Sequence, residues 1–335
     1  MEHAQGFSHY LDVEKGRGVN TIEGYLGDVQ RFRKWLDERP EEGLTIGWVD
    51  VQTRHIRAYL SDLQPSPSYF HRIHSSLKAW FDYLVNIEQA VESNPVTEIG
   101  KPKKKNHHPP TLTVDEVRRM IEMAVEKSRP SERVRNWSLI AVLFGTGLRV
   151  SELVSMNDSS IKYRDGLPNR VTIIGKGNKE RTIPLSKNAR TALHQWLRYR
   201  SKLIDELPPG SDTQAIWIVP AGTYKGKRLT IRSVHKMLER FRNHANIQKT
   251  VNPHKLRHTF ATEAIRNGAK LHAVRDALGH ADLSTTGKYL YADQTELDAV
   301  AASLPDVLGN AKEDDEQLPG TQMLFDDIGV LESDA

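Results

Sequence analysis

The chain has 335 residues, 38% of them hydrophobic and 27% charged, which favours a folded protein of about two domains and excludes a disordered chain. It contains no cysteine, so disulfide frameworks, cysteine nucleophiles and cysteine-based zinc sites are excluded together. The formal net charge is +4, but the last 24 residues carry eight acids and one lysine, so the preceding 311 residues carry +11. A basic body of this kind predicts a polyanionic partner, nucleic acid first, with a solubilising surface as the alternative.

Residues 1–98 are expected to form a small helical domain. Apolar side chains recur at spacings of three and four, typical of helices with one buried face, in three segments: 21–36, 53–63 and 66–85. The polar faces carry basic residues, of which Arg72 and Lys78 are candidate DNA-binding residues. A solvated face without a ligand is the alternative.

Residues 99–111 are predicted to be a basic linker. Its prolines keep the chain extended, and its run of lysines cannot be buried. The central lysines, Lys103, Lys104 and Lys105, are candidate contacts to DNA phosphates. A solvated tether is the alternative.

Residues 112–304 are expected to form a second, larger domain that begins with helices. A capping box opens the first helix at Thr113. An apolar helix over 132–144 then ends at a Gly-Thr-Gly turn, after which Arg149 begins a new helix. We expect an ion pair between Arg149 and Glu152, three residues further on. Such a pair would also hold the guanidinium in place for a phosphate.

The β structure of this domain is expected within residues 159–185. Strands at 171–174 and 181–185 flank a glycine-rich turn that carries Lys176. The turn is not a Walker loop, since no Gly-Lys-Ser/Thr sequence ends it and no helix follows. Most lysines at hairpin tips are only surface residues, so a role for Lys176 depends on the other motifs. Further helices are expected at 186–202, 230–245, 255–267, 270–278 and 296–304.

Residues 254–289 carry several groups that can act on a phosphodiester. His254 and Arg257 lie about one helical turn apart and can face the same phosphate. His280 follows in a Leu-Gly-His sequence and can move a proton near neutral pH. Tyr289 supplies a phenol that can act as a covalent nucleophile.

Neighbouring residues offer two competing interpretations. His254 and His258 have the i,i+4 spacing of zinc ligands, but Lys255 stands where a zinc metalloprotease has glutamate. Tyr291 lies two residues from Tyr289, about 200° around a helix, so only one of them can enter a given pocket. Packing in the core is the alternative for either tyrosine.

Together these motifs resemble those of the tyrosine recombinases, the family of phage integrases and Xer-type resolvases. The motifs cover roughly residues 140–292, and a weaker likeness extends over residues 1–98. The positions that match the family's catalytic residues are Arg149, Lys176, His254, Arg257, His280 and Tyr289. The family's tyrosine typically follows the Leu-Gly-His histidine by about nine residues, which selects Tyr289 over Tyr291. His280 is implied to donate a hydrogen bond to the phosphate.

The resemblance implies a mainly α fold with a small antiparallel β-sheet: an N-terminal helical core-binding domain followed by an α+β catalytic domain. It implies site-specific recombination in which Tyr289 attacks the scissile phosphate, giving a 3′-phosphotyrosyl bond and a free 5′-hydroxyl. Arg149 and Arg257 would stabilise charge on the non-bridging oxygens. His254 would take the tyrosine proton, and Lys176 would protonate the leaving oxygen. No metal, cofactor or ATP is expected.

The expected partners are double-stranded DNA with specific recombination sites and three further copies of the chain, giving a homo-tetramer on two sites. An accessory DNA-bending protein or a partner recombinase is a further candidate. The longest apolar run, 139–144, is too short to span a membrane, and the N-terminus has no signal pattern, so a cytoplasmic, nucleoid-associated location is expected. Two alternatives are a type IB topoisomerase-like enzyme and a non-catalytic DNA-binding regulator on the same fold.

The end of the chain divides into an apolar stripe and an acidic tail. Residues 293–308 carry the stripe, and the resemblance favours packing of this segment on a neighbouring protomer, with packing on its own domain as the alternative. Residues 305–335 form the acidic tail, for which disorder or shielding of the basic surface is expected.

Overall fold

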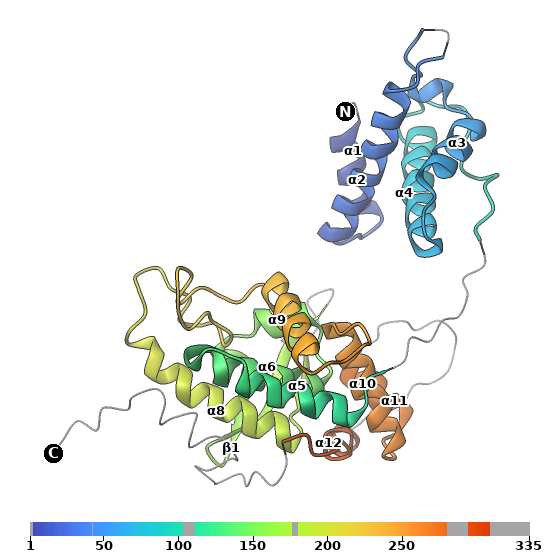
Figure 1. Cartoon of the computed structure of the whole chain (residues 1–335). Coiled ribbons are helices and arrows are strands. Elements are labelled where there is room, and N and C mark those ends of the chain that lie inside the picture. Colours follow the sequence, from blue (N-terminus) through green and yellow to red (C-terminus); the bar gives the residue numbers. More distant parts are fainter. Residues whose placement is uncertain (1–2, 42, 103–110, 176–179, 280–293, 309–335) are drawn as a thin grey trace, which may run out of the picture. The chain divides into compact units, whose positions relative to one another are not determined.

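The computed structural model describes residues 3–41, 43–102, 111–175, 180–279 and 294–308. The chain divides into two units, residues 1–108 and 109–335 (Figure 1). Each unit has its own hydrophobic core. The division falls within the predicted linker. Among the described residues, no helix is both long and apolar enough to cross a membrane.

The N-terminal unit is a helical bundle with an aromatic core. Its helices are α1 (Ala4–His9), α2 (Val19–Asp37), α3 (Thr53–Leu63) and α4 (Pro67–Asn86), with a π-helical turn (Tyr10–Glu14) after α1 and a 3-10 turn (Trp48–Asp50) before α3. The three predicted helices are confirmed as α2, α3 and α4, while α1 and the turn after it were not predicted. Phe7, Phe32 and Trp80 are fully buried between these helices. The long helices α2 and α4 pack directly on each other.

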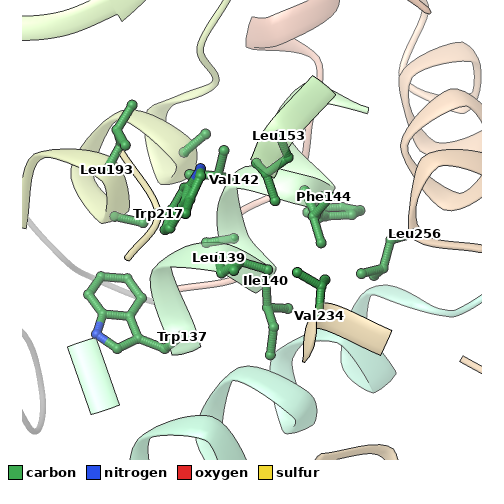
Figure 2. Packing of buried hydrophobic residues seen from close by; sticks show 14 of the residues in the cluster. Trp137, Leu139, Ile140, Val142, Phe144, Leu153, Leu193, Trp217, Val234 and Leu256 are labelled. Atoms are coloured by element: carbon green, nitrogen blue, oxygen red, sulfur yellow. The ribbon is translucent and has the colours of Figure 1, made fainter. Parts of the chain in front are cut away.

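The second unit is built around one buried helix. Its helices are α5 (Val114–Glu126), α6 (Pro130–Thr146), α7 (Val150–Ser155), α8 (Lys187–Ile204), α9 (Ile231–His244), α10 (Pro253–Arg266), α11 (Leu271–Leu278) and α12 (Gln294–Ala302). Every side chain from Val134 to Thr146 in α6 is buried. Figure 2 shows Leu139, Ile140 and Val142 of α6 within the cluster that also holds Trp217 and Leu193. Because α6 is fixed on all sides, the turn that follows it has a defined position.

A small antiparallel sheet lies in the same unit, as the sequence predicted. A 3-10 turn (Asp158–Ser160) leads into β1 (Ile161–Arg164), β2 (Leu167–Ile174) and β3 (Glu180–Pro184), which pair in the order β1-β2-β3. In this register Val171 is opposite both Ile161 and Ile183, and all three side chains are buried. Strands β2 and β3, which flank residues 176–179 in the sequence, are therefore anchored in the core.

Helix α12 packs on its own domain. Val300 is buried in a cluster with Phe260 of α10 and Val274 of α11. Glu296 accepts hydrogen bonds from Lys270 at 2.7 Å and contacts the His272 ring at 2.8 Å. In the single chain the apolar stripe therefore packs on α10 and α11 of its own domain, the alternative that the sequence left open. Packing of this segment on a neighbouring protomer within a tetramer stays a prediction.

Candidate active site

The turn after α6 brings Arg149 to the surface of the second unit. Gly147 caps α6 in the left-handed region, with φ of 62° and its N–H bonded to the Leu143 carbonyl. A Cβ at this position would lie 2.6 Å from the ring of Phe260 in α10, so only glycine lets α10 pack this closely. Arg149 then occupies the N-cap of α7.

Arg149 is bound to Glu152 as the sequence predicted. Its Nη1 lies 2.9 Å from Oε1 of Glu152, and its backbone N–H donates to Oε2 at 2.8 Å. Its Nη2 donates to the carbonyl oxygen of Gly279 at 3.1 Å. The side chain is 43% exposed, so the guanidinium is both held and accessible.

Arg257 lies deeper in the same cluster. It is 5% exposed and donates from Nη1 to the Gly147 carbonyl at 2.8 Å and from Nη2 to the Leu278 carbonyl at 2.6 Å. Burial, and next the nearby Arg149 charge, lower the pKa of Arg257 to about 10, so the group is still protonated at pH 7. A buried cation beside other cations is stabilised by any anion that reaches it.

A third arginine, Arg181, belongs to this cluster and was not among the predicted site residues. It lies on β3 and binds Glu152 with both ends of its fork, Nη1 to Oε1 at 3.0 Å and Nη2 to Oε2 at 2.8 Å. Its Nε donates to the Ala277 carbonyl at 3.4 Å. The sequence did hold one indication that Arg181 faces inward. It lies two residues before the apolar Ile183, which is buried, and alternate residues of a strand share a face.

Glu152 is the carboxylate shared by these groups. Burial would raise its pKa, but the hydrogen bond from Arg181 and the backbone N–H of Arg149 outweigh that effect and hold the pKa below its usual value. Glu152 is therefore ionised at neutral pH.

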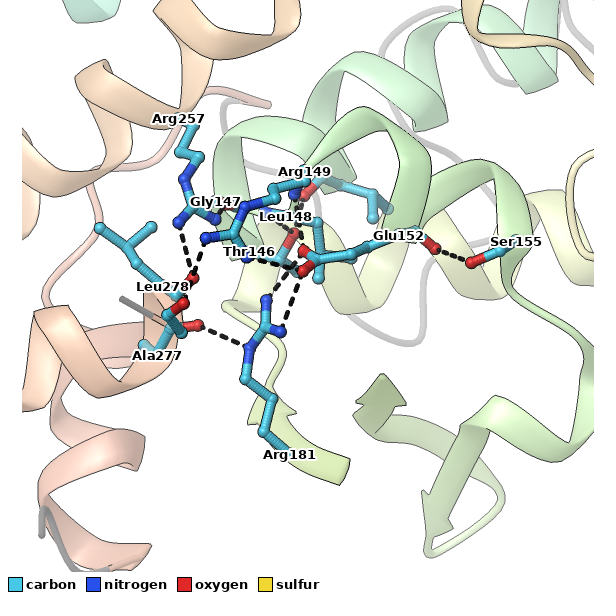
Figure 3. A network of polar contacts seen from close by, with 12 residues as sticks. Thr146, Gly147, Leu148, Arg149, Glu152, Ser155, Arg181, Arg257, Ala277 and Leu278 are labelled. Atoms are coloured by element: carbon cyan, nitrogen blue, oxygen red, sulfur yellow. Dashed lines mark hydrogen bonds and ion pairs between the residues drawn. The ribbon is translucent and has the colours of Figure 1, made fainter. Parts of the chain in front are cut away.

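The C-terminal end of α11 gathers the three guanidinium groups (Figure 3). Its last carbonyl oxygens, those of Ala277, Leu278 and Gly279, each accept from a different arginine. The end of a helix leaves such carbonyls without partners and carries partial negative charge, so cations are favoured there. Three guanidinium groups against one carboxylate leave two positive charges in excess, which suits a phosphodiester.

His254 lies at the start of α10, one turn before Arg257, and its side chain is exposed. Its ring packs edge-on against that of His258, with centroids 4.7 Å apart. Among the residues that the structure describes, no three histidine, aspartate or glutamate side chains are placed to hold a metal ion. Lys176, His280 and Tyr289 lie outside the described residues.

Comparison with known proteins places this cluster in a family. Residues 110–296 match the model described as "Phage integrase family", and residues 4–87 match its N-terminal SAM-like domain. A tyrosine recombinase XerD from Oceanobacillus iheyensis is 34% identical over 301 residues, covering 89% of this chain and 96% of that protein. A tyrosine recombinase XerC from Alcanivorax borkumensis is 33% identical over 316 residues, covering 94% and 97%. The chain belongs to the phage integrase family of tyrosine recombinases.

Solved structures show the same fold. The crystal structure of the XerH site-specific recombinase bound to palindromic difH substrate, a post-cleavage complex, has a TM-score of 0.61 at 22% identity, covering 84% of this chain and 78% of that chain. A lambda integrase (75–356) dimer bound to a COC′ core site has a TM-score of 0.58 at 21% identity, covering 86% and 97%. The chain is thus a Xer-type tyrosine recombinase, an enzyme of site-specific recombination that breaks and rejoins DNA strands.

In the N-terminal unit of the recombinase, Arg72 belongs to a preorganised polar cluster. The fully buried carboxylate of Asp28 accepts from Arg72 at 2.9 Å, from the Ser76 hydroxyl at 2.7 Å and from Arg31. The Arg72 guanidinium also lies over the Tyr69 ring, 4.9 Å from its centroid. Both arginine side chains are about half exposed, so one buried carboxylate fixes two surface cations.

Lys78 lies on the same helix as Arg72, in a groove of about 260 Å³. It pairs with Asp82 at 2.7 Å, and Asn94 donates to the same carboxylate. The groove is lined by further basic side chains: Lys15, Arg17 and Lys101. Lys103, Lys104 and Lys105 lie outside the described residues.

Proposed function

We propose that this recombinase cleaves DNA through a 3′-phosphotyrosyl intermediate. The observation that carries the proposal is the cluster of Arg149 and Arg257, which offers guanidinium groups to a phosphate with His254 one turn away. Charge that develops on the non-bridging oxygens would meet donors that are already in place.

In the proposed step, the phenol oxygen of Tyr289 attacks the scissile phosphorus while the bond to the 5′-oxygen breaks. His254 takes the phenolic proton, and Lys176 gives a proton to the leaving 5′-oxygen. His280 donates a hydrogen bond to the phosphate. One phosphodiester replaces another, so the attack of the free 5′-hydroxyl on the tyrosyl ester rejoins the strand without ATP. The proposal gives no role to a metal or cofactor.

The proposed substrate is double-stranded DNA with specific sites, bound by a tetramer on two sites. Likeness to structures of XerH bound to difH and of lambda integrase on a core site supports DNA as the partner. In the N-terminal unit, Arg72 and Lys78 would contact the DNA backbone, and the linker lysines 103–105 would follow phosphates between the units. Binding should weaken with salt, by about 0.9 in log K per log unit of salt for each phosphate neutralised.

Two alternative functions differ in what they do to DNA. A type IB topoisomerase-like enzyme would relax supercoils without a defined site, and a non-catalytic regulator would bind without forming an adduct. Identity of 34% to a XerD protein and 33% to a XerC protein, each over most of the chain, favours recombination over relaxation.

The deciding experiment traps the covalent complex. The enzyme is incubated with sheared genomic DNA from its source cells, protein-linked fragments are isolated, and their junctions are sequenced to define the site. A duplex of that site with a nick next to the scissile phosphate then traps the adduct. Tyr289→Phe should form none while binding nearly as well, because only the phenol oxygen is lost, and Tyr291→Phe should form it normally. An adduct that persists in Tyr289→Phe would contradict the assignment.

A further inference from the structure

Arg181 has every side-chain nitrogen engaged inside the protein. Nη1 and Nη2 donate to the two oxygens of Glu152, and Nε donates to the Ala277 carbonyl. Its side chain is 17% exposed, against 43% for Arg149. Both Nη atoms of Arg181 bind a charged carboxylate, which a phosphate displaces less readily than the neutral carbonyls bound by Arg257. The geometry therefore directs the Arg181 guanidinium toward protein groups, while Arg149 keeps an exposed surface for a phosphate.

The carboxylate that Arg181 binds is the one that orients Arg149. Glu152 accepts from the backbone N–H and from Nη1 of Arg149 at 2.8 and 2.9 Å. A carboxylate clamped on both oxygens by a planar fork cannot rotate freely, and lysine cannot reproduce this because it offers a point charge. The position of Arg149 thus depends on Arg181 through one shared group.

Arg181 also packs against the end of α11. Gly279 has φ of 65°, and a Cβ there would lie 2.8 Å from Cζ of Arg181. The guanidinium therefore lies directly over the Gly279 backbone, and Gly279 is the residue before His280. In the sequence, Arg181 is five residues beyond Lys176. Its side chain joins β3, the helix α7 that Arg149 caps, and the end of α11.

We propose that Arg181 is a positioning residue for strand cleavage, which fixes Glu152, and through it Arg149, against the end of α11. The inference rests on the proposed function, since it assigns Arg149 to the scissile phosphate. Arg181 itself does not touch the DNA. Its loss displaces groups that do, and a displacement of about 1 Å can cost on the order of 10²-fold in rate.

The first test compares Arg181→Lys with Arg200→Lys. Arg200 is a matched control because it lies in the same unit, is even more deeply buried (5% exposed against 17%), and binds both oxygens of Asp158 with its fork. Single-turnover cleavage of the nicked site duplex is measured at saturating enzyme, with DNA affinity measured by band shift. Arg181→Lys should cleave about 10- to 100-fold more slowly at unchanged affinity, while Arg200→Lys should lower only thermal stability. Equal cleavage rates in the two variants would overturn the proposal.

A double-mutant cycle tests whether Arg181 acts through Glu152. Residues that act through one another show losses that do not add. Arg181→Lys in a Glu152→Gln background should therefore slow cleavage no further than the slower single variant. If the fold loss of cleavage rate in the double variant equals the product of the two single losses, the residues act independently. That result would exclude an effect of Arg181 through Glu152.

Hydrogen exchange separates this proposal from the proposed function. If the wild-type enzyme forms no covalent adduct with DNA, the phosphotyrosyl proposal fails. The positioning role of Arg181 is still tested in that case, because amide hydrogen exchange is measured on the protein without cleavage. In Arg181→Lys, residues 147–153 and 276–279 should exchange faster than in wild type and in Arg200→Lys, because the Arg149 N–H and the end of α11 lose a fixed partner. Unchanged exchange in both segments would refute the positioning role.

Discussion

Nη2 of Arg149 donates a hydrogen bond to the carbonyl oxygen of Gly279 at 3.1 Å, although 130 residues separate the two in sequence. Arg257 binds the preceding carbonyl, that of Leu278, at 2.6 Å. Helix α11 therefore keeps both guanidinium groups together. A charged phosphate oxygen is a stronger acceptor than a carbonyl, so it can take over these donors with little movement of either side chain.

Replacing either arginine by lysine tests whether the fork matters. Arg149→Lys and Arg257→Lys should each cleave more slowly by about 10²–10³, the loss typical of one oxyanion donor, because a point charge cannot donate to two acceptors in a plane. Band shifts on the same duplex should show nearly unchanged affinity. Full single-turnover cleavage by either variant would argue against phosphate clamping by that residue.

Gly279→Ala offers a second test, with Gly268→Ala as its control. Both glycines have positive φ, 65° and 91°, so alanine costs backbone energy of about 1–2 kcal/mol at either position. Only at Gly279 does the new Cβ collide with Arg181, since nothing lies within 4 Å at Gly268. We expect both variants to lose stability in chemical denaturation, Gly279→Ala by more because of the collision, and we expect slower cleavage in Gly279→Ala alone. Equal cleavage by both variants would show that the Gly279 contact is unimportant.

Local patterns in the sequence predicted much of the fold. The spacing of apolar residues placed α2, α3 and α4, and the i,i+3 spacing predicted the ion pair of Arg149 with Glu152 that the structure contains. Such signals depend on residues within one or two turns of each other. They need no knowledge of how elements pack.

Contacts between distant segments could not be predicted in this way. Arg181 reaches Glu152 across 29 residues and Ala277 across 96, so no local period reports either contact. The packing of α12 on its own domain could not be predicted for the same reason. Its apolar stripe indicates that the helix packs on an apolar surface but does not identify that surface. The catalytic roles remain predictions for all six candidate residues: Arg149, Lys176, His254, Arg257, His280 and Tyr289.

Asp28→Asn should weaken the N-terminal unit and its binding to DNA. The variant keeps the shape of the side chain but removes the charge that holds Arg31 and Arg72. Loss of hydrogen bonds to a charged group should lower the free energy of unfolding by about 2–3 kcal/mol. Glu38→Gln, which removes an exposed carboxylate lying 3.8 and 3.9 Å from the exposed Lys34 and Arg39, is the control and should have a much smaller effect. Equal unfolding midpoints and equal DNA affinity in the two variants would contradict the role of Asp28.

Glu296 should make the packing of α12 depend on pH in the acid range. Hydrogen bonds from Lys270, then from His272, lower the pKa of Glu296 to about 2 from its usual 4.5. A carboxylate with a lowered pKa in the folded state contributes stability that is present above pH 4.5 and lost as pH falls through about 2.

Glu296→Gln should therefore expose residues 294–302 to hydrogen exchange at pH 5. The difference from wild type should narrow at pH 3, where the wild-type carboxylate has lost part of its stabilising effect. Asp298 lies on the same helix as Glu296 and pairs with Arg170 of β2. Asp298→Asn is therefore the control for loss of a neighbouring negative charge. A difference between Glu296→Gln and wild type that is as large at pH 3 as at pH 5 would show that the contacts to Lys270 and His272 do not hold α12.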